Sequence, residues 1–187
     1  MSTSAQLSLA QYDRMIAGGV FEPRDGRRLE FIHGEIREMT PIGSEHEEVV
    51  DRLDEWSHDN APKEQIRVRV QNSIGLPELD SAPEPDIAWV ARRDYSQGRP
   101  EAEDVLLVIE VADSSLDYDR GTKADLYSSA GIADYWVVNI PERTVEVRRD
   151  PGPTHYRSLQ TYRGDDEIRP LAAPSAALRP ALLWPSR

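Results

Sequence analysis

The sequence predicts an α/β or α+β fold in which a mixed β-sheet is flanked by helices. Two observations support this prediction: helical and strand-like segments follow one another along the chain, and the apolar run 105–111 is typical of a strand covered on both faces. A chain of 187 residues with 39% hydrophobic residues is long enough to bury a core. We therefore expect one domain spanning 1–187.

The first segments predict a helix followed by a hairpin. Ser8 is suited to cap a helix whose apolar residues recur at helical spacing until Gly18. Strand-like segments at 29–32 and 35–39 then flank His33-Gly34, a two-residue turn in which glycine supplies a positive φ.

The next segments predict a second helix and three strands. Ser44 and Glu47 have the spacing of a capping box, and Pro62 closes the amphipathic segment that follows them. The expected strands cover 66–70, 86–90 and 105–111.

The last segments predict a third helix, a hairpin and a Pro-rich tail. The helix is expected over about 119–130, and the hairpin over 135–140 and 144–147. From about 150 to 187 we expect one short strand near 156–159 and an irregular tail. The residues expected to anchor that tail are Leu178, Leu182, Leu183 and Trp184.

Composition excludes several classes of protein. The chain has no cysteine, so disulfides and thiolate metal sites are impossible. No apolar stretch approaches the roughly 18 residues of a membrane span, and the start lacks the pattern of a signal peptide, so we expect a cytoplasmic protein without membrane contact. With 34 acidic and 22 basic residues the net charge is -12, which argues against a non-specific nucleic-acid binder.

Several catalytic motifs are also absent. His46-Glu47 begins like a zinc-protease motif, but Val50 stands where the second histidine is needed. The chain has no Gly-x-Ser-x-Gly elbow, no phosphate-binding glycine loop with Lys-Ser/Thr and no dinucleotide fingerprint.

Three residues have chemistry at odds with their surroundings. Glu110 interrupts the most apolar strand, where an unpaired carboxylate costs several kcal/mol to bury. Asp86 follows a proline that fixes the backbone. Lys123 is one of two lysines and shares a helix face with apolar residues, so its ammonium is expected to meet these acids at the strand ends.

Two acids and a lysine suggest a metal-assisted reaction. Neighbouring carboxylates repel unless a cation lies between them, and their oxygens suit Mg²⁺ or Mn²⁺. A lysine beside that ion would orient water or stabilise charge on a phosphoryl oxygen, as phosphodiester hydrolysis requires. Buried acids and lysines also form purely structural ion pairs, and the residues alone leave both interpretations open.

These residues form a wider pattern with the hairpin 29–35 and with His46. Its remaining parts are Pro85-Asp86, Glu110-Val111, Asp119, Lys123, Tyr127, Gly131 and Tyr135-Trp136. From roughly Leu7 to Asn139 the chain resembles the bacterial family of "putative restriction endonucleases", a branch of the PD-(D/E)XK nuclease superfamily. After Glu110-Val111 the family usually continues with a Leu-Ser-Pro-Ser type loop, whereas this chain has the segment 112–115, Ala-Asp-Ser-Ser.

The resemblance implies a restriction-endonuclease-like fold and a set of site residues. It implies that Asp86 and Glu110 are metal ligands, joined by the backbone carbonyl of Val111. Glu30 matches an additional acid that the superfamily often contributes from an early element. The superfamily's lysine usually stands two residues after the second acid, and the resemblance implies that Lys123 on the following helix replaces it.

Other residues are weaker candidates. His46, Asp119 and Tyr127 are candidates for contacting phosphate or supporting the ligands. Six arginines are candidates for gripping a phosphate backbone, although exposed arginines are usually solvated surface: Arg92, Arg93, Arg99, Arg143, Arg148 and Arg149.

The leading hypothesis is an Mg²⁺- or Mn²⁺-dependent endonuclease that hydrolyses DNA, and the resemblance suggests a homodimer. One alternative is a catalytically inactive dimeric interaction module on the nuclease fold. Another is a hydrolase of a different phosphoester.

Overall fold

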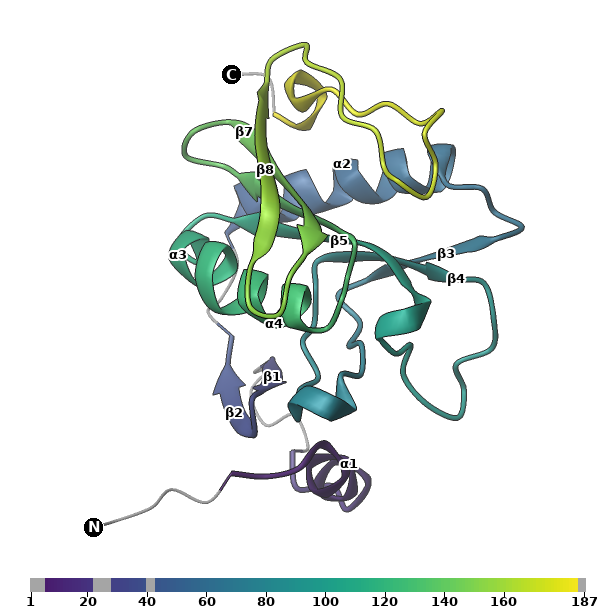
Figure 1. Cartoon of the computed structure of the whole chain (residues 1–187), viewed down its shortest axis with the longest axis vertical. Helices are drawn as coiled ribbons and strands as arrows, with labels where there is room; N and C mark the ends of the chain where they lie inside the picture. Colours follow the sequence, from purple (N-terminus) through teal and green to yellow (C-terminus); the bar gives the residue numbers. More distant parts are fainter. Residues whose placement is uncertain (1–5, 22–27, 40–42, 185–187) are drawn as a thin grey trace.

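Six strands form the central sheet of the computed structural model, which describes residues 6–21, 28–39 and 43–184 (Figure 1). Their order in space follows their order in the chain, with β3 and β8 at the edges. β5 and β6 pair in parallel, and the other neighbours pair antiparallel. This mixed sheet with helices confirms the predicted fold class. The strands are β3 (Ile66–Val70), β4 (Ile87–Ala91), β5 (Val105–Ala112), β6 (Asp134–Asn139), β7 (Thr144–Pro151) and β8 (Tyr156–Arg163).

Alternating side chains of β5 contribute to two hydrophobic cores. Ile109 and Val111 belong to the core that α2 (Ser44–Asn60) covers on one face of the sheet. Val108 belongs to the core that α4 (Ala124–Ser129) covers on the other face. The strand is buried along almost its whole length, as its apolar sequence predicts.

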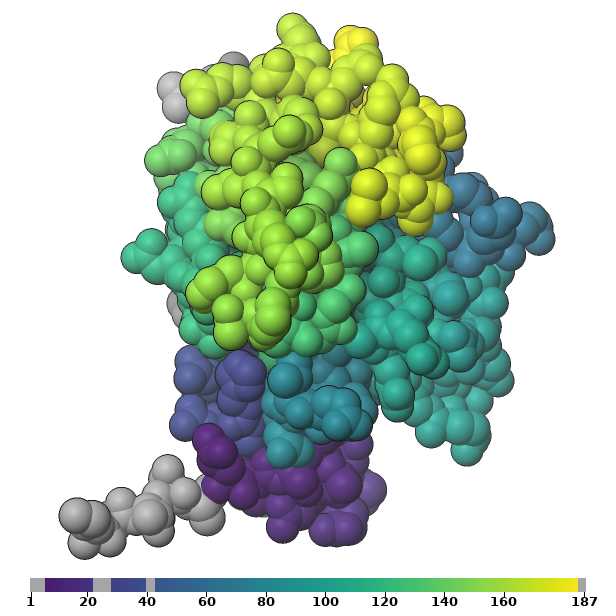
Figure 2. Space-filling model, viewed as in Figure 1, coloured from purple at the N-terminus to yellow at the C-terminus, as the bar shows by residue number. Residues whose placement is uncertain are grey.

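The N-terminal elements gather at one end of the molecule, and the segment after β8 covers the opposite end (Figure 2). α1 (Leu9–Ala17) packs against a separate hairpin of β1 (Leu29–Ile32) and β2 (Glu35–Glu38). The Tyr12 and Phe31 rings stack with centroids 4.5 Å apart, which joins the helix to the hairpin.

Local signals in this region are confirmed. The Ser8 hydroxyl accepts a hydrogen bond from the Gln11 N–H and caps α1. His33 and Gly34 form the turn of the hairpin with φ values of 50° and 77°. Two successive positive φ values match the twist of the flanking strands, which explains why glycine is needed there.

The third predicted helix begins earlier than expected and is not uniform. α3 (Leu116–Tyr118) leads into a π-helical turn, Asp119–Lys123, which continues as α4. A π-helical turn brings residues five apart over one another, and the Lys123 ammonium lies 5.9 Å from the centre of the Tyr118 ring. An ordinary helical period does not predict this neighbour.

Three further expectations were wrong in detail. Ser44 is the first residue of α2 rather than its cap, because Gly43 takes the extended backbone of the N-cap position and no side chain caps the helix. The strand expected near 156–159 runs to Arg163, since it pairs with β7 along its length. Leu182 is 61% exposed, whereas Leu178 and Leu183 are buried.

The remaining helical segments are short 3₁₀ turns. They are Pro77–Leu79, Ala102–Asp104 and Pro180–Leu183. Within the described ranges, no helix combines the length and the apolar character needed to cross a membrane.

Candidate active site

Glu110 is a buried carboxylate at the centre of the site. It alternates with Ile109 and Val111 along β5, so its side chain points to the face of the sheet that α4 covers. Only 3% of Glu110 is exposed. Its Oε1 accepts hydrogen bonds from the Tyr127 hydroxyl at 2.8 Å and from the Lys123 ammonium at 3.0 Å. The buried Glu110 carboxylate, which the apolar sequence of β5 would leave without partners, therefore has two hydrogen-bond donors, Lys123 and Tyr127.

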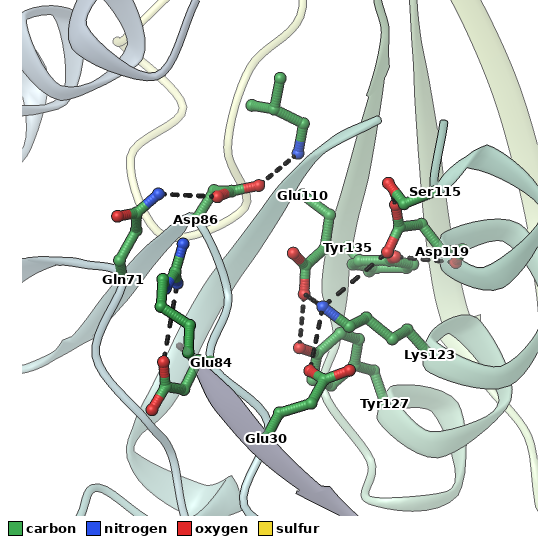
Figure 3. A network of polar contacts seen from close by, with 12 residues as sticks. Glu30, Gln71, Glu84, Asp86, Glu110, Ser115, Asp119, Lys123, Tyr127 and Tyr135 are labelled. Carbon is green, nitrogen blue, oxygen red and sulfur yellow. Dashed lines mark hydrogen bonds and ion pairs between the residues drawn. The ribbon is translucent and has the colours of Figure 1, made fainter. Parts of the chain in front are cut away.

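Lys123 ends the π-helical turn and is surrounded by acids (Figure 3). Besides Glu110, its Nζ lies 3.4 Å from Glu30 Oε2 and 3.8 Å from Asp119 Oδ1. Glu30 comes from β1 in the separate hairpin, and Asp119 lies one helical turn before the lysine. Three elements, β1, β5 and the π-helical turn itself, thus place acids around one ammonium.

Asp86 directly precedes β4 and forms a second centre beside the first. Its Oδ2 accepts a hydrogen bond from the Val111 N–H at 2.9 Å and lies 3.3 Å from His46 Nε2. Gln71 Nε2 donates to Oδ1 at 3.3 Å. These partners come from β5, from the first turn of α2 and from the residue after β3, so Asp86 is held rigidly.

Charge and burial shift the pKa values of the lysine cluster. Burial raises the pKa of Glu110, and the Lys123 ammonium opposes this rise. Burial also raises the pKa of Asp119 to about 6, again opposed by Lys123. Burial alone would lower the pKa of Lys123, but Glu110 and Glu30 outweigh it and hold that pKa above its ordinary value. Lys123 therefore keeps its proton at neutral pH.

Asp86 and His46 shift in opposite directions. Burial would raise the pKa of Asp86, but the hydrogen bond and charge of His46 hold it below its ordinary value. Burial would lower the pKa of His46, but Asp86 and a backbone hydrogen bond with Val111 raise it. Asp86 is thus ionised and available as an anionic oxygen ligand.

A cavity of about 340 Å³ connects the two centres. Its walls include the four acids Glu30, Asp86, Glu110 and Asp119 together with Lys123. Because this is the volume of a small ligand rather than of a single water, the acids face a space in which a substrate group and ordered water fit together.

Two arginines from the hairpin region also line the cavity. Arg37 lies over the Tyr118 ring at 5.3 Å, and an Arg28 nitrogen lies 3.6 Å from Glu84 Oε2. They add positive charge to an otherwise acidic cavity, which matters for any anionic substrate.

The predicted residues come together with one difference. Lys123 was expected to meet Asp86 and Glu110, but it forms ion pairs with Glu110, Glu30 and Asp119, while Asp86 contacts His46 instead. Tyr127 contacts Glu110 directly. His46, a weaker candidate, is 8% exposed and lies within the site.

Sequence reasoning missed several residues of the site. Tyr118 lines the cavity but lies under Lys123 only because of the π-helical turn, which leaves no periodic signal. Gln71 follows a strand in a left-handed conformation, with φ 50°, and nothing in its neighbourhood marks it. Ser115 donates a hydrogen bond to Asp119 Oδ2 at 2.6 Å. Its position shortly before an acidic helix start is the one sequence signal that could have identified it.

Most of the candidate arginines take part in internal ion pairs. Arg93 pairs with Asp104, and Arg99 with Asp13. On the later hairpin, Arg148 pairs with Glu146 and Arg149 with Asp134. These four arginines therefore already have acidic partners within the protein.

The donor atoms fit a hard divalent cation. Asp86, directly before β4, and Glu110, on the neighbouring strand β5, offer carboxylate oxygens. The Val111 N–H donates to Asp86, and in an extended strand the Val111 carbonyl points to the same side. Among the residues described, no cluster of three or more His, Asp or Glu side chains is arranged to hold a metal. A shell of two carboxylates, one carbonyl and water does not need a third such side chain, so the fit stands.

Comparison with known proteins places this chain in a family. The profile of the Uma2 family, described as "putative restriction endonuclease", matches residues 9–181. The chain belongs to the Uma2 family. The expected family membership is therefore confirmed, and the acids and lysine described above all lie inside the matched region of this Uma2 chain.

A solved structure shares the Uma2 chain's fold. It is described as a putative nuclease belonging to DUF820 from Anabaena variabilis ATCC 29413. The likeness has a TM-score of 0.72 at 18% sequence identity and covers 95% of this chain and 97% of that chain. No curated protein matches the sequence. At this identity the comparison shows that the two chains share a fold.

Proposed function

We propose that this Uma2 protein is a nuclease that hydrolyses DNA phosphodiester bonds with the help of Mg²⁺ or Mn²⁺. The observation that carries the proposal is that Lys123 and Glu110 form an ion pair in the same cavity as Asp86, which directly precedes the adjacent strand β4. An acid directly before one strand, an acid on its neighbour and a lysine beside them resemble the PD-(D/E)XK arrangement, and in this proposal the following helix supplies the lysine.

The metal ligands in this proposal are Asp86, Glu110 and the Val111 carbonyl. When bound, the ion supplies a Lewis acid that lowers the pKa of a water and offsets charge on the phosphoryl oxygens. The surroundings of the two acids differ, because His46 holds the pKa of Asp86 below its ordinary value whereas burial raises the pKa of Glu110.

Lys123 acts in this proposal as a fixed cation rather than as a base. Its raised pKa means that it cannot accept a proton at neutral pH. Its ammonium instead donates hydrogen bonds, which orient a water or stabilise a phosphate oxygen in the transition state. Glu30 and Asp119 hold the ammonium, and Tyr127 fixes the carboxylate of Glu110.

Plasmid cleavage tests the proposal. The wild-type protein is expected to nick supercoiled DNA in Mg²⁺ or Mn²⁺ and to stop when EDTA is added. Asp86→Asn should reduce the rate at least about 100-fold, because it removes an anionic ligand from a preorganised site. Asp59→Asn, an exposed acid on α2, makes the same chemical change away from the cavity and should leave the rate unchanged. Equal cleavage by both variants would sink the assignment.

The non-catalytic alternative has one observation in its favour. Lys123 already has three acidic partners, as in a structural network. The same experiment separates the two functions: a structural module shows no metal-dependent cleavage, and its unfolding temperature does not rise with Mg²⁺, because no ligand stabilises the folded state.

A further inference from the structure

Arg37 places a solvated cation at the mouth of the acidic cavity. In the register of the β1–β2 hairpin it lies directly opposite Glu30, so both side chains project from the same face of the hairpin, and both line the cavity. The Arg37 side chain is 44% exposed, whereas the Lys123 side chain, which lines the same cavity, is 4% exposed. The cavity therefore has a buried cation in its wall and an accessible cation where solvent enters.

The Tyr118 ring holds Arg37 on the side of the cavity where Lys123 lies. The Arg37 Cζ atom is 5.3 Å from the centre of this ring, and the Lys123 Nζ atom is 5.9 Å from the same point. Burial and the charge of Glu30 raise the pKa of Tyr118, so the ring is neutral at pH 7 and meets the guanidinium with its π-face. Two cations therefore lie against one ring in the cavity wall.

Arg37 can exchange its acidic partner for a ligand at small cost. Glu30, although opposite Arg37 in the hairpin, turns its Oε2 to the Lys123 ammonium at 3.4 Å (Figure 3). Arg37 instead pairs with Glu35 Oε2 at 3.2 Å, and both of these side chains are exposed. An ion pair between two solvated side chains contributes little to stability, so a phosphate can replace the Glu35 carboxylate.

Arg28, which also lines the cavity, is less available than Arg37. Its guanidinium lies 3.6 Å from Glu84 Oε2, and both of these side chains are partly buried. Burial raises the pKa of Glu84, and the charge of Arg28 opposes this rise. If Arg28 turned to a ligand, Glu84 would be left partly buried without its counter-charge. Arg37 is therefore the arginine of this wall that is free to bind a substrate.

We propose that Arg37, held on Tyr118, binds a phosphate of the DNA strand to be cleaved and so positions that strand over the acids and Lys123. The planar guanidinium fork matches two oxygens of a phosphodiester. The inference rests on the proposed function, because it names a residue that positions the substrate of that same site. It also supplies local positive charge beside four acids in a protein whose net charge is -12.

Fluorescence anisotropy of a labelled duplex of about 20 base pairs, at a fixed Mg²⁺ concentration, tests the proposal. Every protein in the series carries Glu110→Gln, so that the duplex stays intact. Adding Arg37→Gln should weaken binding about tenfold and reduce the slope of log affinity against log salt by about 1, because one phosphate contact is lost. Adding Arg37→Lys should keep the slope and give an intermediate affinity, because the charge remains and the fork is lost.

Arg157→Gln is the matched control. Arg157 is an exposed arginine on β8 that pairs with the exposed Asp150 at 3.1 Å, so the substitution removes the same charge and the same kind of ion pair. It should change the affinity by less than about twofold and leave the salt slope unchanged. Thermal unfolding without DNA is measured on the same proteins. A lower melting temperature for Arg37→Gln with an unchanged salt slope would assign Arg37 to supporting the hairpin and overturn the proposal.

The outcomes distinguish the role of Arg37 from the nuclease activity. Equal affinities and slopes in the Arg37→Gln and Arg157→Gln proteins would overturn the role of Arg37, even where the wild-type protein cleaves DNA. A parent protein that binds no duplex would overturn it as well. Binding that depends on Arg37, in a chain whose wild-type form shows no metal-dependent cleavage, would keep the phosphate contact and overturn the proposed function.

Discussion

Lys123 neutralises carboxyl groups that would otherwise be buried without a counter-charge. Glu30, Glu110 and Asp119 each lie within 4.0 Å of its Nζ, and each is less than 5% exposed. Removing one partner of a buried ionic group costs more than the group contributes intact, because the remaining charge loses both water and its partner. The lysine is therefore important for folding as well as for the proposed chemistry.

Lys123→Ala should lower the free energy of unfolding by about 3–5 kcal/mol at neutral pH. Lys63, the other lysine, is exposed, and Lys63→Ala should change the free energy of unfolding by less than about 0.5 kcal/mol. Urea denaturation of both variants measures the difference. A Lys123→Ala protein as stable as the Lys63→Ala protein would show that the acids do not depend on the ammonium.

At the scale of elements, the β1–β2 hairpin is what brings Glu30 to the site. Its strands pair across a two-residue turn, and Phe31 bridges to Ala82 near the end of the segment that leads to Asp86. A displaced turn moves β1, and with it the acid that contacts Lys123. The geometry of Gly34 therefore affects the site from a distance.

Gly34→Ala should destabilise the protein by about 1–3 kcal/mol, because φ is +77° and a Cβ would lie 2.8 Å from Gln6 Cβ and 2.9 Å from the Leu7 carbonyl oxygen. Gly98→Ala meets nothing within 4 Å and serves as the matched control. Thermal unfolding of the two variants checks this. A Gly34→Ala melting temperature equal to that of Gly98→Ala would contradict the strained turn.

The same elements show how much of the fold the sequence predicts. Strand β5 and the His33-Gly34 turn were predictable because apolar runs and positive-φ residues leave local signals. The capping of α2 by Gly43 was not, since Ser44 and Glu47 match a capping box one residue away from the actual start. Local patterns therefore identify elements better than they fix helix ends.

The sequence predicted which residues form the site but not which of them pair with one another. Asp86, Glu110 and Lys123 stood out because their charges conflict with apolar surroundings. Which acid meets the lysine depends on the π-helical turn and on the position of the hairpin, and neither has a periodic signature.

For the whole molecule, the buried acids make stability depend on pH. Burial raises the pKa of Glu110 to about 8 and that of Asp119 to about 6, so the folded protein binds more protons than the unfolded chain between about pH 4.5 and 8. The raised pKa of His46 acts in the same direction. The free energy of unfolding should therefore fall as pH rises through this window.

Urea denaturation with EDTA at about pH 5.5, 7 and 8.5 measures that dependence. The stability of the wild-type protein should decrease from the first pH to the last, and Glu110→Gln should show a shallower decrease because it removes the largest titrating contribution. Stability that rises with pH, or identical slopes for the two proteins, would mean that burial does not raise the pKa of Glu110 in the folded protein.

The most direct test of the central claim is the rate of Mg²⁺-dependent plasmid cleavage by Glu110→Gln. This substitution keeps the size of the side chain and an acceptor for Tyr127, so the protein should remain folded while the carboxyl group that would bind the metal is lost. Glu55→Gln, an exposed acid on α2, is the matched control. We expect wild type and Glu55→Gln to cleave at the same rate and Glu110→Gln to be at least about 100-fold slower. A folded Glu110→Gln protein that cleaves as fast as wild type would contradict the assignment of the site.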